Sequence, residues 1–339
     1  MRILYGVLGV GNGHITRAEE LYPALSKYGK VDILISGKNA DIKLPFPVKY
    51  QFKGLNLAFG KLGGINFLKS VTQNNLLRFL KDCQQIPIHK YDLIITDLEP
   101  MSAWMAQSQQ IPCIGISNQY TASIISEFFT GKKAQYLKQK VLPNLFYTLM
   151  TPTNRVYGYH YHDHHPRLFT PLIRKEIRDL KPTTQNHYTA YLTAYGEMTI
   201  RRVLSKFPEI EWEVFCKHTK TIHTKKNITF YPVCQKHFLK SLASCKGLIC
   251  NSGFGITSEA IALKKKILTI PMPHFEQQFN AASLQKLGAT VIPRLSVLHN
   301  DTISQWIRSR KVIDLEYKNN ANFIAKKIME DFELMKKQL

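Results

Sequence analysis

Short apolar segments that alternate with helix-like segments are the feature that most constrains the fold of this chain. The sequence opens with RILYGVL, and KVDILIS, YDLIITD (91–97) and IPCIGIS (111–117) follow in the first half. Segments that are apolar throughout, and not only at every second residue, are typical of parallel strands buried on both faces. The pattern therefore predicts an α/β fold in which helices cover both sides of a parallel sheet.

The same alternation begins again in the second half of the chain. Five further strands are predicted, at HYTAYLTAYG, IEWEVFCK, NITFYPV, KGLICNSG and KILTIPM. A helix is predicted from about Ile256, after the fourth of them. A length of 339 residues is enough for two domains, each with its own core. We expect a first domain over residues 1–165, a linker rich in Pro, His and Tyr over 166–182, a second domain over 183–315 and a C-terminal helical segment over 316–339.

The chain is strongly basic. Its formal net charge is +22, from 46 Lys and Arg against 24 Asp and Glu. Such a charge attracts phosphates, nucleic acids or an anionic lipid surface, although a generally basic proteome explains it equally well. No zinc-finger, RNP-like or helix-turn-helix pattern accompanies the charge, so we expect no specific nucleic-acid partner.

Cysteine spacing and hydropathy exclude several other classes of protein. The six cysteines are scattered without a CxxC pair, which indicates core thiols and neither a zinc site nor a disulfide framework. No apolar run approaches the roughly 18–20 residues of a membrane span, and glycines interrupt the opening run too early for a secretory signal. We expect a cytoplasmic protein, with the inner face of the cytoplasmic membrane as the one surface it could contact.

The opening glycine loop supports three interpretations. Gly9, Gly11 and Gly13 run as GxGxG, and His14 follows them directly. A dinucleotide site needs GxGxxG and an acidic residue about 20 positions on, a place that Asp32 could fill. A plain strand-to-helix turn with an exposed histidine is the second interpretation. We favour the third, an active-site loop in which the glycines admit a ligand and His14 acts as a general base, since an ordinary imidazole titrates near neutral pH.

A base of this kind needs a partner that orients its ring. Asp97 follows the strand YDLIITD and would lie at the same edge of the sheet as His14. A carboxylate behind an imidazole fixes its tautomer and stabilises its charged form. Glu99 lies two residues further on and could take the same role. Taken alone, an acidic residue after a strand, as Asp97 is, is more often a helix cap or solvated than catalytic.

The segment over 247–292 carries the most specific pattern. A strand runs into a glycine turn at Gly253 and Gly255, which opens a helix whose free N–H groups and dipole favour a phosphate. Glu259 is predicted in the first turn of that helix, where it would either accept hydrogen bonds from two ribose hydroxyls or simply complement the dipole.

A second polar loop follows in the same segment. Prolines at 271 and 273 stiffen it, and His274, Glu276 and Gln277 are side chains able to bind the hydroxyls of a sugar. A solvent-exposed loop without function is the alternative interpretation.

Four segments together resemble a known family. SGFGITSEA and IPMPHFEQQFNA are similar, in order and spacing, to the donor-nucleotide motif of GT-B glycosyltransferases, particularly the plant-type UDP-glycosyltransferases and the N-acetylglucosaminyltransferase that forms lipid II. GNGH is similar to the glycine loop ending in His that opens these enzymes, and DLIITDLEPMSAWMA to the strand that carries the dyad aspartate of the plant-type group. The order of parts also resembles that of a group of small microbial relatives.

The resemblance implies a fold and a donor site. The fold is GT-B, with two Rossmann-like domains facing a cleft, the acceptor on the first, the nucleotide sugar on the second, and a C-terminal helix that packs back on the first. It places Glu259 on the ribose, the backbone of 253–257 on the diphosphate, and Glu276 and Gln277 on the donor sugar. The implied donor-binding residues are Asn251, Ser252, Gly253, Gly255, Ile256, Thr257, Glu259, His274, Glu276 and Gln277. Further residues of the implied cleft are Gly11, Asn12, Gly13, Glu99, Thr193, Tyr195, Gly196 and Val233.

Two departures weaken part of this transfer. LTAYGEM (192–198) stands where the lipid II enzyme has a Gly-Gly-Ser phosphate turn. FYPVCQKHF (230–238) lacks the tryptophan that the plant-type enzymes carry near the uracil. Base recognition is therefore the least supported part of the donor site.

These observations lead to one hypothesis about the activity. The chain is a glycosyltransferase of the hexosyltransferase class that moves a sugar from a UDP-linked donor to an acceptor hydroxyl, with inversion, His14 as base and Asp97 as its orienting partner. The sequence shows no DxD-type cluster, so neither metal nor cofactor is expected. The histidines of YHYHDHHP (159–166) do not change this, since adjacent histidines on a linker seldom make a closed metal site.

The acceptor and two rival activities stay open. Basic and apolar residues alternate over 128–150, which fits a lipid-linked acceptor at an anionic membrane, an ordinary domain helix being the alternative; a polysaccharide is the other acceptor class. A nucleotide-sugar 2-epimerase would share the fold and the ribose-binding glutamate. A non-catalytic binder of nucleotide sugars or anionic polymers would explain the charge.

Overall fold

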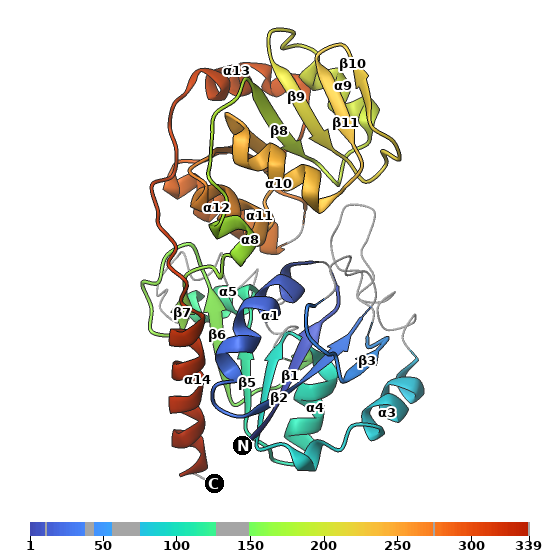
Figure 1. Cartoon of the computed structure of the whole chain (residues 1–339), viewed down its shortest axis with the longest axis vertical. Coiled ribbons are helices and arrows are strands. Elements are labelled where there is room, and N and C mark those ends of the chain that lie inside the picture. The colour runs from blue at the N-terminus through green and yellow to red at the C-terminus, as the bar shows by residue number, and fades with distance from the viewer. Residues whose placement is uncertain (11, 38–43, 56–74, 127–148, 274, 338–339) are drawn as a thin grey trace. The chain divides into compact units, whose positions relative to one another are not determined.

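The structure is a computed structural model that describes residues 1–10, 12–37, 44–55, 75–126, 149–273 and 275–337 (Figure 1). The chain forms two compact units. The first unit contains the described residues up to Arg174 and those from Lys318 onward, and the second contains Lys175–Tyr317. Gly11, His274 and nearly all of 128–150 lie outside the described residues, so the predictions made for them are not pursued.

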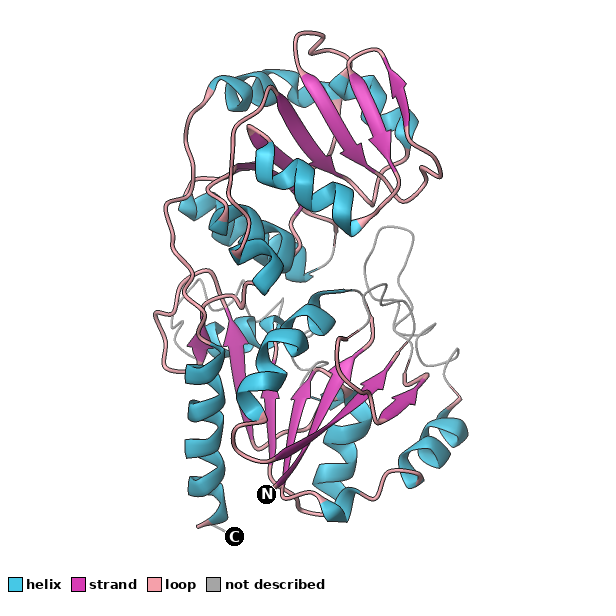
Figure 2. Ribbon diagram, viewed as in Figure 1, coloured by secondary structure: helices cyan, strands magenta, loops and turns pink. Residues whose placement is uncertain are grey.

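The first unit is built on a seven-stranded parallel sheet (Figure 2). In spatial order its strands are β3 (Tyr50–Phe52), β2 (Lys30–Ser36), β1 (Arg2–Leu8), β4 (Leu93–Asp97), β5 (Cys113–Ile116), β6 (Arg155–Tyr159) and β7 (Leu168–Phe169). Its α-helices are α1 (Asn12–Leu25), α3 (Leu76–Gln84), α4 (Pro100–Ser108), α5 (Thr121–Ser126) and α14 (Ala321–Lys336), and two 3₁₀ turns cover Ile88–Lys90 and Asn118–Tyr120. The strand order reverses between β1 and β4, and ligands of open α/β sheets bind where it does.

The second unit repeats this plan with a second seven-stranded sheet. In spatial order its strands are β10 (His223–Lys225), β11 (Ile228–Tyr231), β9 (Glu211–Phe215), β8 (His187–Tyr191), β12 (Gly247–Asn251), β13 (Lys266–Ile270) and β14 (Thr290–Val291). Its helices are α8 (Lys175–Arg178), α9 (Glu197–Leu204), α10 (Gln235–Ser244), α11 (Phe254–Ala262), α12 (Phe275–Leu287) and α13 (Asn300–Arg308), with a 3₁₀ turn at Val297–His299. All strand pairs are parallel except β10 with β11, and the order reverses between β8 and β12.

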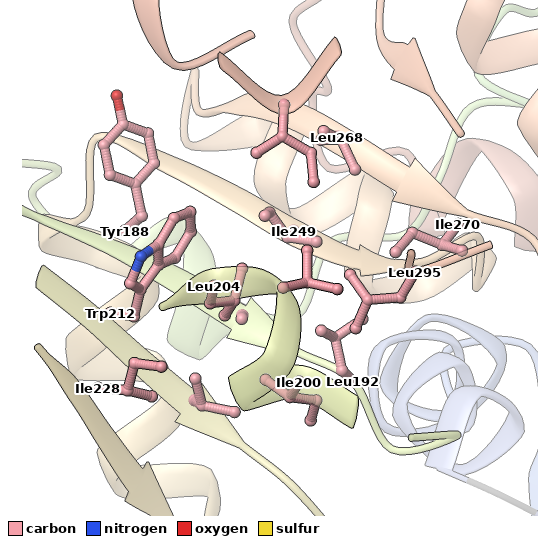
Figure 3. Close-up of a cluster of buried hydrophobic side chains, with 14 of the residues drawn as sticks. Tyr188, Leu192, Ile200, Leu204, Trp212, Ile228, Ile249, Leu268, Ile270 and Leu295 are labelled. Carbon is pink, nitrogen blue, oxygen red and sulfur yellow. The ribbon is translucent and has the colours of Figure 1, made fainter. Parts of the chain in front are cut away.

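A buried apolar cluster holds the sheet of the second unit in place (Figure 3). Trp212 of β9, Ile249 of β12 and Leu268 of β13 lie on one face of the sheet and are almost fully excluded from solvent. Ile200 of α9 and Trp306 of α13 join the same cluster, so these two helices cover the same face. Burial of large apolar side chains contributes about 1.5–3 kcal/mol each. The strand ends that carry the candidate donor residues therefore project from a rigid layer.

The α/β class with two parallel sheets is confirmed, and the ends of two helices differ from the predicted ones. Helix α1 begins at Asn12, so His14 lies inside its first turn rather than before it. Helix α11 begins at Phe254 and not near Ile256, so the prediction that Glu259 lies in the first turn was wrong: Glu259 is the sixth residue and lies in the second turn. Within the described residues, no helix is long and apolar enough to span a bilayer.

Candidate active site

His14 and Asp97 lie in hydrogen-bond contact in the first unit. His14 is the third residue of α1, which follows β1, and Asp97 is the last residue of β4. Strand β4 pairs with β1, and Asp97 lies opposite Val7, so both side chains stand at the carboxyl edge where the strand order reverses. Nδ1 of His14 lies 2.8 Å from Oδ1 of Asp97, and both side chains are buried. Among the described residues, Nε2 of His14 has no hydrogen-bond partner.

Arg17 and Ser117 complete the surroundings of the aspartate. Arg17 lies one turn after His14 on α1 and donates from Nε to Oδ2 and from Nη2 to Oδ1 of Asp97, each at 2.8 Å. Ser117, next to the end of β5, donates its hydroxyl to Oδ1 at 2.7 Å. This two-pronged pairing of a guanidinium with a carboxylate is the strongest geometry that such an ion pair can take.

The local charges keep the aspartate ionised. Burial alone raises the pKa of a carboxyl, but the adjacent Arg17 and His14 outweigh burial and hold the pKa of Asp97 well below its usual range. Burial likewise disfavours the cation of Arg17, yet Asp97 raises the pKa of that guanidinium above its ordinary value. Asp97 and Arg17 are therefore a buried, charged and mutually neutralising pair at neutral pH.

Glu99 serves a different purpose. It is the N-cap of α4, where its carboxylate accepts from the backbone N–H of Met101 at 2.8 Å and of Ser102 at 2.7 Å. It also accepts the hydroxyl of Ser36 and is fully buried, and burial raises the pKa of Glu99. Asp97 is therefore the carboxylate that contacts His14, while Glu99 holds the start of a helix.

The residues that would support a dinucleotide site are arranged differently. Asp32 is the third residue of β2, away from the carboxyl end of that strand. Its carboxylate accepts from Lys49 at 2.5 Å and from the Tyr91 hydroxyl at 2.8 Å. Asp32 is thus part of a local ion pair at the wrong end of its strand to bind a ribose, which argues against the dinucleotide interpretation.

In the second unit, the turn after β12 leads into an open helix start. Gly253 is the N-cap of α11 and makes no side-chain capping bond, while the Thr257 hydroxyl donates to the Gly253 carbonyl at 2.8 Å. A Cβ placed on Gly255 would meet no atom within 4 Å. The first N–H groups of a helix lack partners within it, so this start offers donors in an uncrowded place.

Buried polar side chains brace this turn from behind. Gln277 of α12 is buried, and its Oε1 accepts from the backbone N–H of Ser252 at 3.1 Å and of Met272 at 2.9 Å. Asn280 donates to the Ser252 carbonyl at 3.0 Å, and Asn251 donates to the Ile270 carbonyl at 3.0 Å. The side-chain carbonyl of Gln277 therefore binds the backbone of two loops. The sequence resemblance assigns this residue to the donor sugar, a role that stays a prediction.

The two acidic donor candidates lie on two helices of the same unit. Glu259 is half-buried on the second turn of α11, and Glu276 is the half-buried second residue of α12. The two helices follow neighbouring strands of the sheet, β12 and β13, so both begin at the same edge of the sheet.

The remaining candidates of the second unit lie around other strand ends. Gly196 is the exposed N-cap of α9, and the Tyr195 hydroxyl before it accepts from the Leu295 N–H at 3.2 Å. Thr193 is half-buried, and Val233, just before α10, is 38% exposed. Helices α9, α10 and α11 all begin without a side-chain cap, and all follow parallel strands of one sheet.

The described part of the chain holds no obvious metal centre. No group of three or more His, Cys, Asp or Glu side chains in the described ranges is placed to bind an ion. Of the clustered histidines, His160 and His164 contact each other edge to face, with ring centroids 5.3 Å apart.

The two Rossmann-like units and the residues at their strand ends define a protein of the GT-B class. Residues 1–309 match the family model described as glycosyl transferase family 1, so the chain belongs to that family and is a glycosyltransferase. The predicted membership and enzyme class are confirmed. No curated protein matches the sequence.

Solved structures show the same fold at low sequence identity. The glycosyltransferase SnogD from Streptomyces nogalater is 14% identical, with 98% of this chain and 96% of that chain covered and a TM-score of 0.54. UGT2 of Phytolacca americana, complexed with UDP-2-fluoro-glucose and pterostilbene, is 13% identical over 98% and 93% of the two chains, with a TM-score of 0.57. MnaA of S. aureus, complexed with UDP, is 8% identical over 100% and 98%, with a TM-score of 0.64.

Two residues of the site were not found by sequence reasoning. Arg17 lies three positions after His14, a spacing that places both on one helical face, so the segment GNGHITR contained the signal. Ser117 ends the strand segment next to the one that carries Asp97, and its hydroxyl gave no signal of its own.

Proposed function

We propose that this glycosyltransferase moves a sugar from a nucleoside diphosphate sugar, most simply a UDP-sugar, to an acceptor hydroxyl with inversion at C1. The observation that carries the catalytic part is the 2.8 Å contact between Nδ1 of His14 and Asp97 at the switch point of the first sheet. A carboxylate at Nδ1 leaves Nε2 as the nitrogen able to accept a proton.

The chemical step needs no group besides the two substrates and the protein. The acceptor oxygen forms a bond to C1 of the sugar as its proton passes to Nε2 of His14. The bond from C1 to the phosphate oxygen breaks, and its electron pair leaves with the nucleoside diphosphate. Attack from the side opposite the leaving group inverts C1. General-base assistance of this kind contributes about 10²- to 10⁴-fold in rate.

The proposed donor site uses the start of α11. The N–H groups of Gly253 and Thr257 already donate to backbone carbonyls, at 2.8 and 3.3 Å. The leaving diphosphate would therefore accept from the N–H groups of Gly255 and Ile256, with the positive end of the helix dipole adding about 0.3–2 kcal/mol per charge. Glu259 would accept from the ribose hydroxyls and Glu276 from the sugar. The UDP-linked choice is supported by the sequence resemblance and by the UDP complexes of the Phytolacca americana and S. aureus proteins.

The test begins with the donor. UDP-, GDP- and dTDP-sugars are screened for thermal stabilisation of the protein, and the donor that binds is then offered with lipid-linked and polysaccharide acceptors. We expect stabilisation by a UDP-sugar and transfer of its sugar to one acceptor class. Turnover of the donor without acceptor would instead indicate a 2-epimerase, and binding without turnover a non-catalytic binder.

The His14→Ala variant tests the catalytic assignment. We expect kcat to fall by about 10²- to 10⁴-fold, while UDP affinity stays within about twofold, because the ring is assigned to the acceptor proton and not to the nucleotide. His89→Ala removes an exposed histidine of the same unit and should leave both quantities unchanged. A collapse of UDP affinity in His14→Ala would move His14 to the nucleotide site.

A further inference from the structure

Three polar atoms of the site form a nearly equilateral triangle. Nδ1 of His14 lies 2.8 Å from Oδ1 of Asp97 and 2.7 Å from Nη2 of Arg17, while Nη2 lies 2.8 Å from Oδ1. Nδ1 either carries a proton and donates it to Asp97, or lacks one and accepts from Arg17. These two tautomers leave Nε2 respectively without and with a proton, so His14 is a base only in the first. In that tautomer Nδ1 donates to Oδ1 of Asp97, and Nη2 of Arg17 donates to the same oxygen.

The charges around this triangle are balanced before any proton reaches His14. Arg17 and Asp97 neutralise each other at two hydrogen bonds. Among the described residues, the other titratable groups that interact with the pair are Tyr5 of β1, Tyr120, and Tyr159 of β6, whose ring lies 5.6 Å from the Arg17 guanidinium carbon. Burial raises the pKa of all three phenols, so none carries charge at neutral pH. A protonated His14 would therefore gain little from the Asp97 charge, which Arg17 already neutralises. It would also have the Arg17 cation 2.7 Å from its Nδ1.

We propose that Arg17 is a positioning residue that keeps His14 uncharged and ready to accept a proton. Without Arg17, the unneutralised carboxylate of Asp97 would favour a protonated His14. Nε2 would then already carry a proton when the acceptor binds. With Arg17 present, the Asp97 carboxylate still orients the His14 ring, but its negative charge is neutralised and His14 stays able to accept a proton. This role rests on the proposed function, because it acts through His14.

The pH dependence of kcat provides the test, with the identified UDP-sugar and acceptor. In Arg17→Met, the acidic limb of the profile should move to higher pH by about 1–2 units, because a cation within about 4–6 Å no longer opposes protonation of His14. Activity at pH 7 should fall as a result, by at most about tenfold for each unit of this shift. Arg17→Lys restores the cation without the two parallel hydrogen bonds of the guanidinium. It should return the acidic limb of the pH profile toward its wild-type position, with a lower maximal kcat.

Two further variants keep the proposal falsifiable even if Arg17→Met folds poorly. Asp97→Asn should move the limb to lower pH, and Arg17→Met with Asp97→Asn removes both charges and should bring it back to within about half a unit of wild type. Arg155→Met is the matched control. Arg155 forms an ion pair with the buried Asp331 at 2.9 Å, in the same unit but not with His14 or Asp97. The acidic limb of the Arg155→Met pH profile should therefore stay at its wild-type position.

The outcomes separate this inference from the proposed function. Equal profiles for wild type, Arg17→Met and Arg17→Lys would overturn the role of Arg17 while His14→Ala remained inactive. An active His14→Ala variant would overturn the base assignment itself. A plateau loss in Arg17→Met without any movement of the limb would show that Arg17 is merely structural, and UDP-induced thermal stabilisation reports whether each variant is folded.

Discussion

Two glycines, Gly6 of β1 and Gly255 of α11, have different reasons to lack a side chain. A Cβ on Gly6 of β1 would lie 2.2 Å from the Ser102 hydroxyl oxygen, so the close approach of α4 to the strand requires glycine there. A Cβ on Gly255 would meet no atom within 4 Å, and its backbone has no positive φ. The fold itself therefore does not require glycine at Gly255, and a ligand that approaches the backbone is the simplest reason for one.

This contrast predicts opposite effects on stability and binding. Gly255→Ala should raise the free energy of unfolding by about 0.4–1 kcal/mol, because alanine loses less backbone entropy in a helix. The same methyl group should weaken UDP affinity by about tenfold or more, equivalent to about 1.4 kcal/mol, since it occupies the space proposed for the diphosphate. Urea unfolding and a UDP titration measure the two effects.

The control for this variant is an alanine at a glycine that packing does require. Gly6→Ala should lower the free energy of unfolding, because the Ser102 side chain must move. Unchanged UDP affinity in Gly255→Ala would contradict the proposed position of the diphosphate.

At the scale of elements, the end of α13 depends on a lysine from a neighbouring strand. Lys266 of β13 is buried, and its Nζ donates to the carbonyls of Trp306, Ile307 and Ser309 at 2.6–3.0 Å. The ammonium also lies 5.0 Å from the ring centroid of Tyr188. The last carbonyls of a helix have no partner within it, and this ammonium supplies them with a charged donor. The Trp306 carbonyl also accepts from the Ser309 N–H at 3.2 Å, and the Ile307 carbonyl from the Tyr188 hydroxyl at 3.1 Å.

Lys266→Met should therefore destabilise the second unit. Methionine keeps the apolar stem but removes the charged donor that three carbonyls share, and we expect a loss of about 1–3 kcal/mol in the free energy of unfolding. Urea unfolding followed by tryptophan fluorescence measures it, since Trp306 lies beside the substituted ammonium. Lys286→Met makes the same substitution at an exposed position of α12 and should have no measurable effect. An equal loss in both variants would assign the effect to net charge and not to the helix end.

The elements also separate what the sequence predicts from what it cannot. The central strands β1, β2, β4, β5, β8, β9, β12 and β13 were predicted because strands covered on both faces are rich in apolar residues. Strand β10 contains only His223–Lys225 and β7 only Leu168–Phe169, and edge strands this short carry no periodic signal. The start of α1 was missed because Asn12 and Gly13 are poor helix formers, which tertiary packing overrides.

The candidate site divides in the same way. His14 and Asp97 were predicted to be partners because residues at the ends of parallel strands meet at one edge of a sheet, and they are in contact. The bracing role of Gln277 was not predictable, because it depends on the distance between two loops that only the folded backbone determines. Arg17 was overlooked because its burial beside Asp97, which makes it part of the site, appears only in the folded structure.

On the scale of the whole molecule, the chain returns to its first unit at the end. Residues from Lys318 onward belong to that unit, where α14 packs beside α1. The Tyr157 hydroxyl of β6 donates to the buried carboxylate of Asp331 on α14, and Arg155 pairs with the same residue. The first unit is therefore completed by a segment that follows the entire second unit in sequence, which couples its stability to the last residues described.

This arrangement predicts that a change near the C-terminus destabilises the strands that carry His14 and Asp97. Phe332 of α14 is 3% exposed, and Phe332→Ala should lower the stability of the first unit by about 3–5 kcal/mol through lost burial and the cavity left behind. Hydrogen exchange measured by mass spectrometry should accelerate in β1, β4 and β6 but not in β8, β12 and β13. Leu334→Ala changes an exposed residue of the same helix, 52% accessible, and should leave both sets of strands unaltered. Equal acceleration in the two sheets would mean that the units open as one cooperative body, and α14 would then stabilise the entire chain rather than the first unit alone.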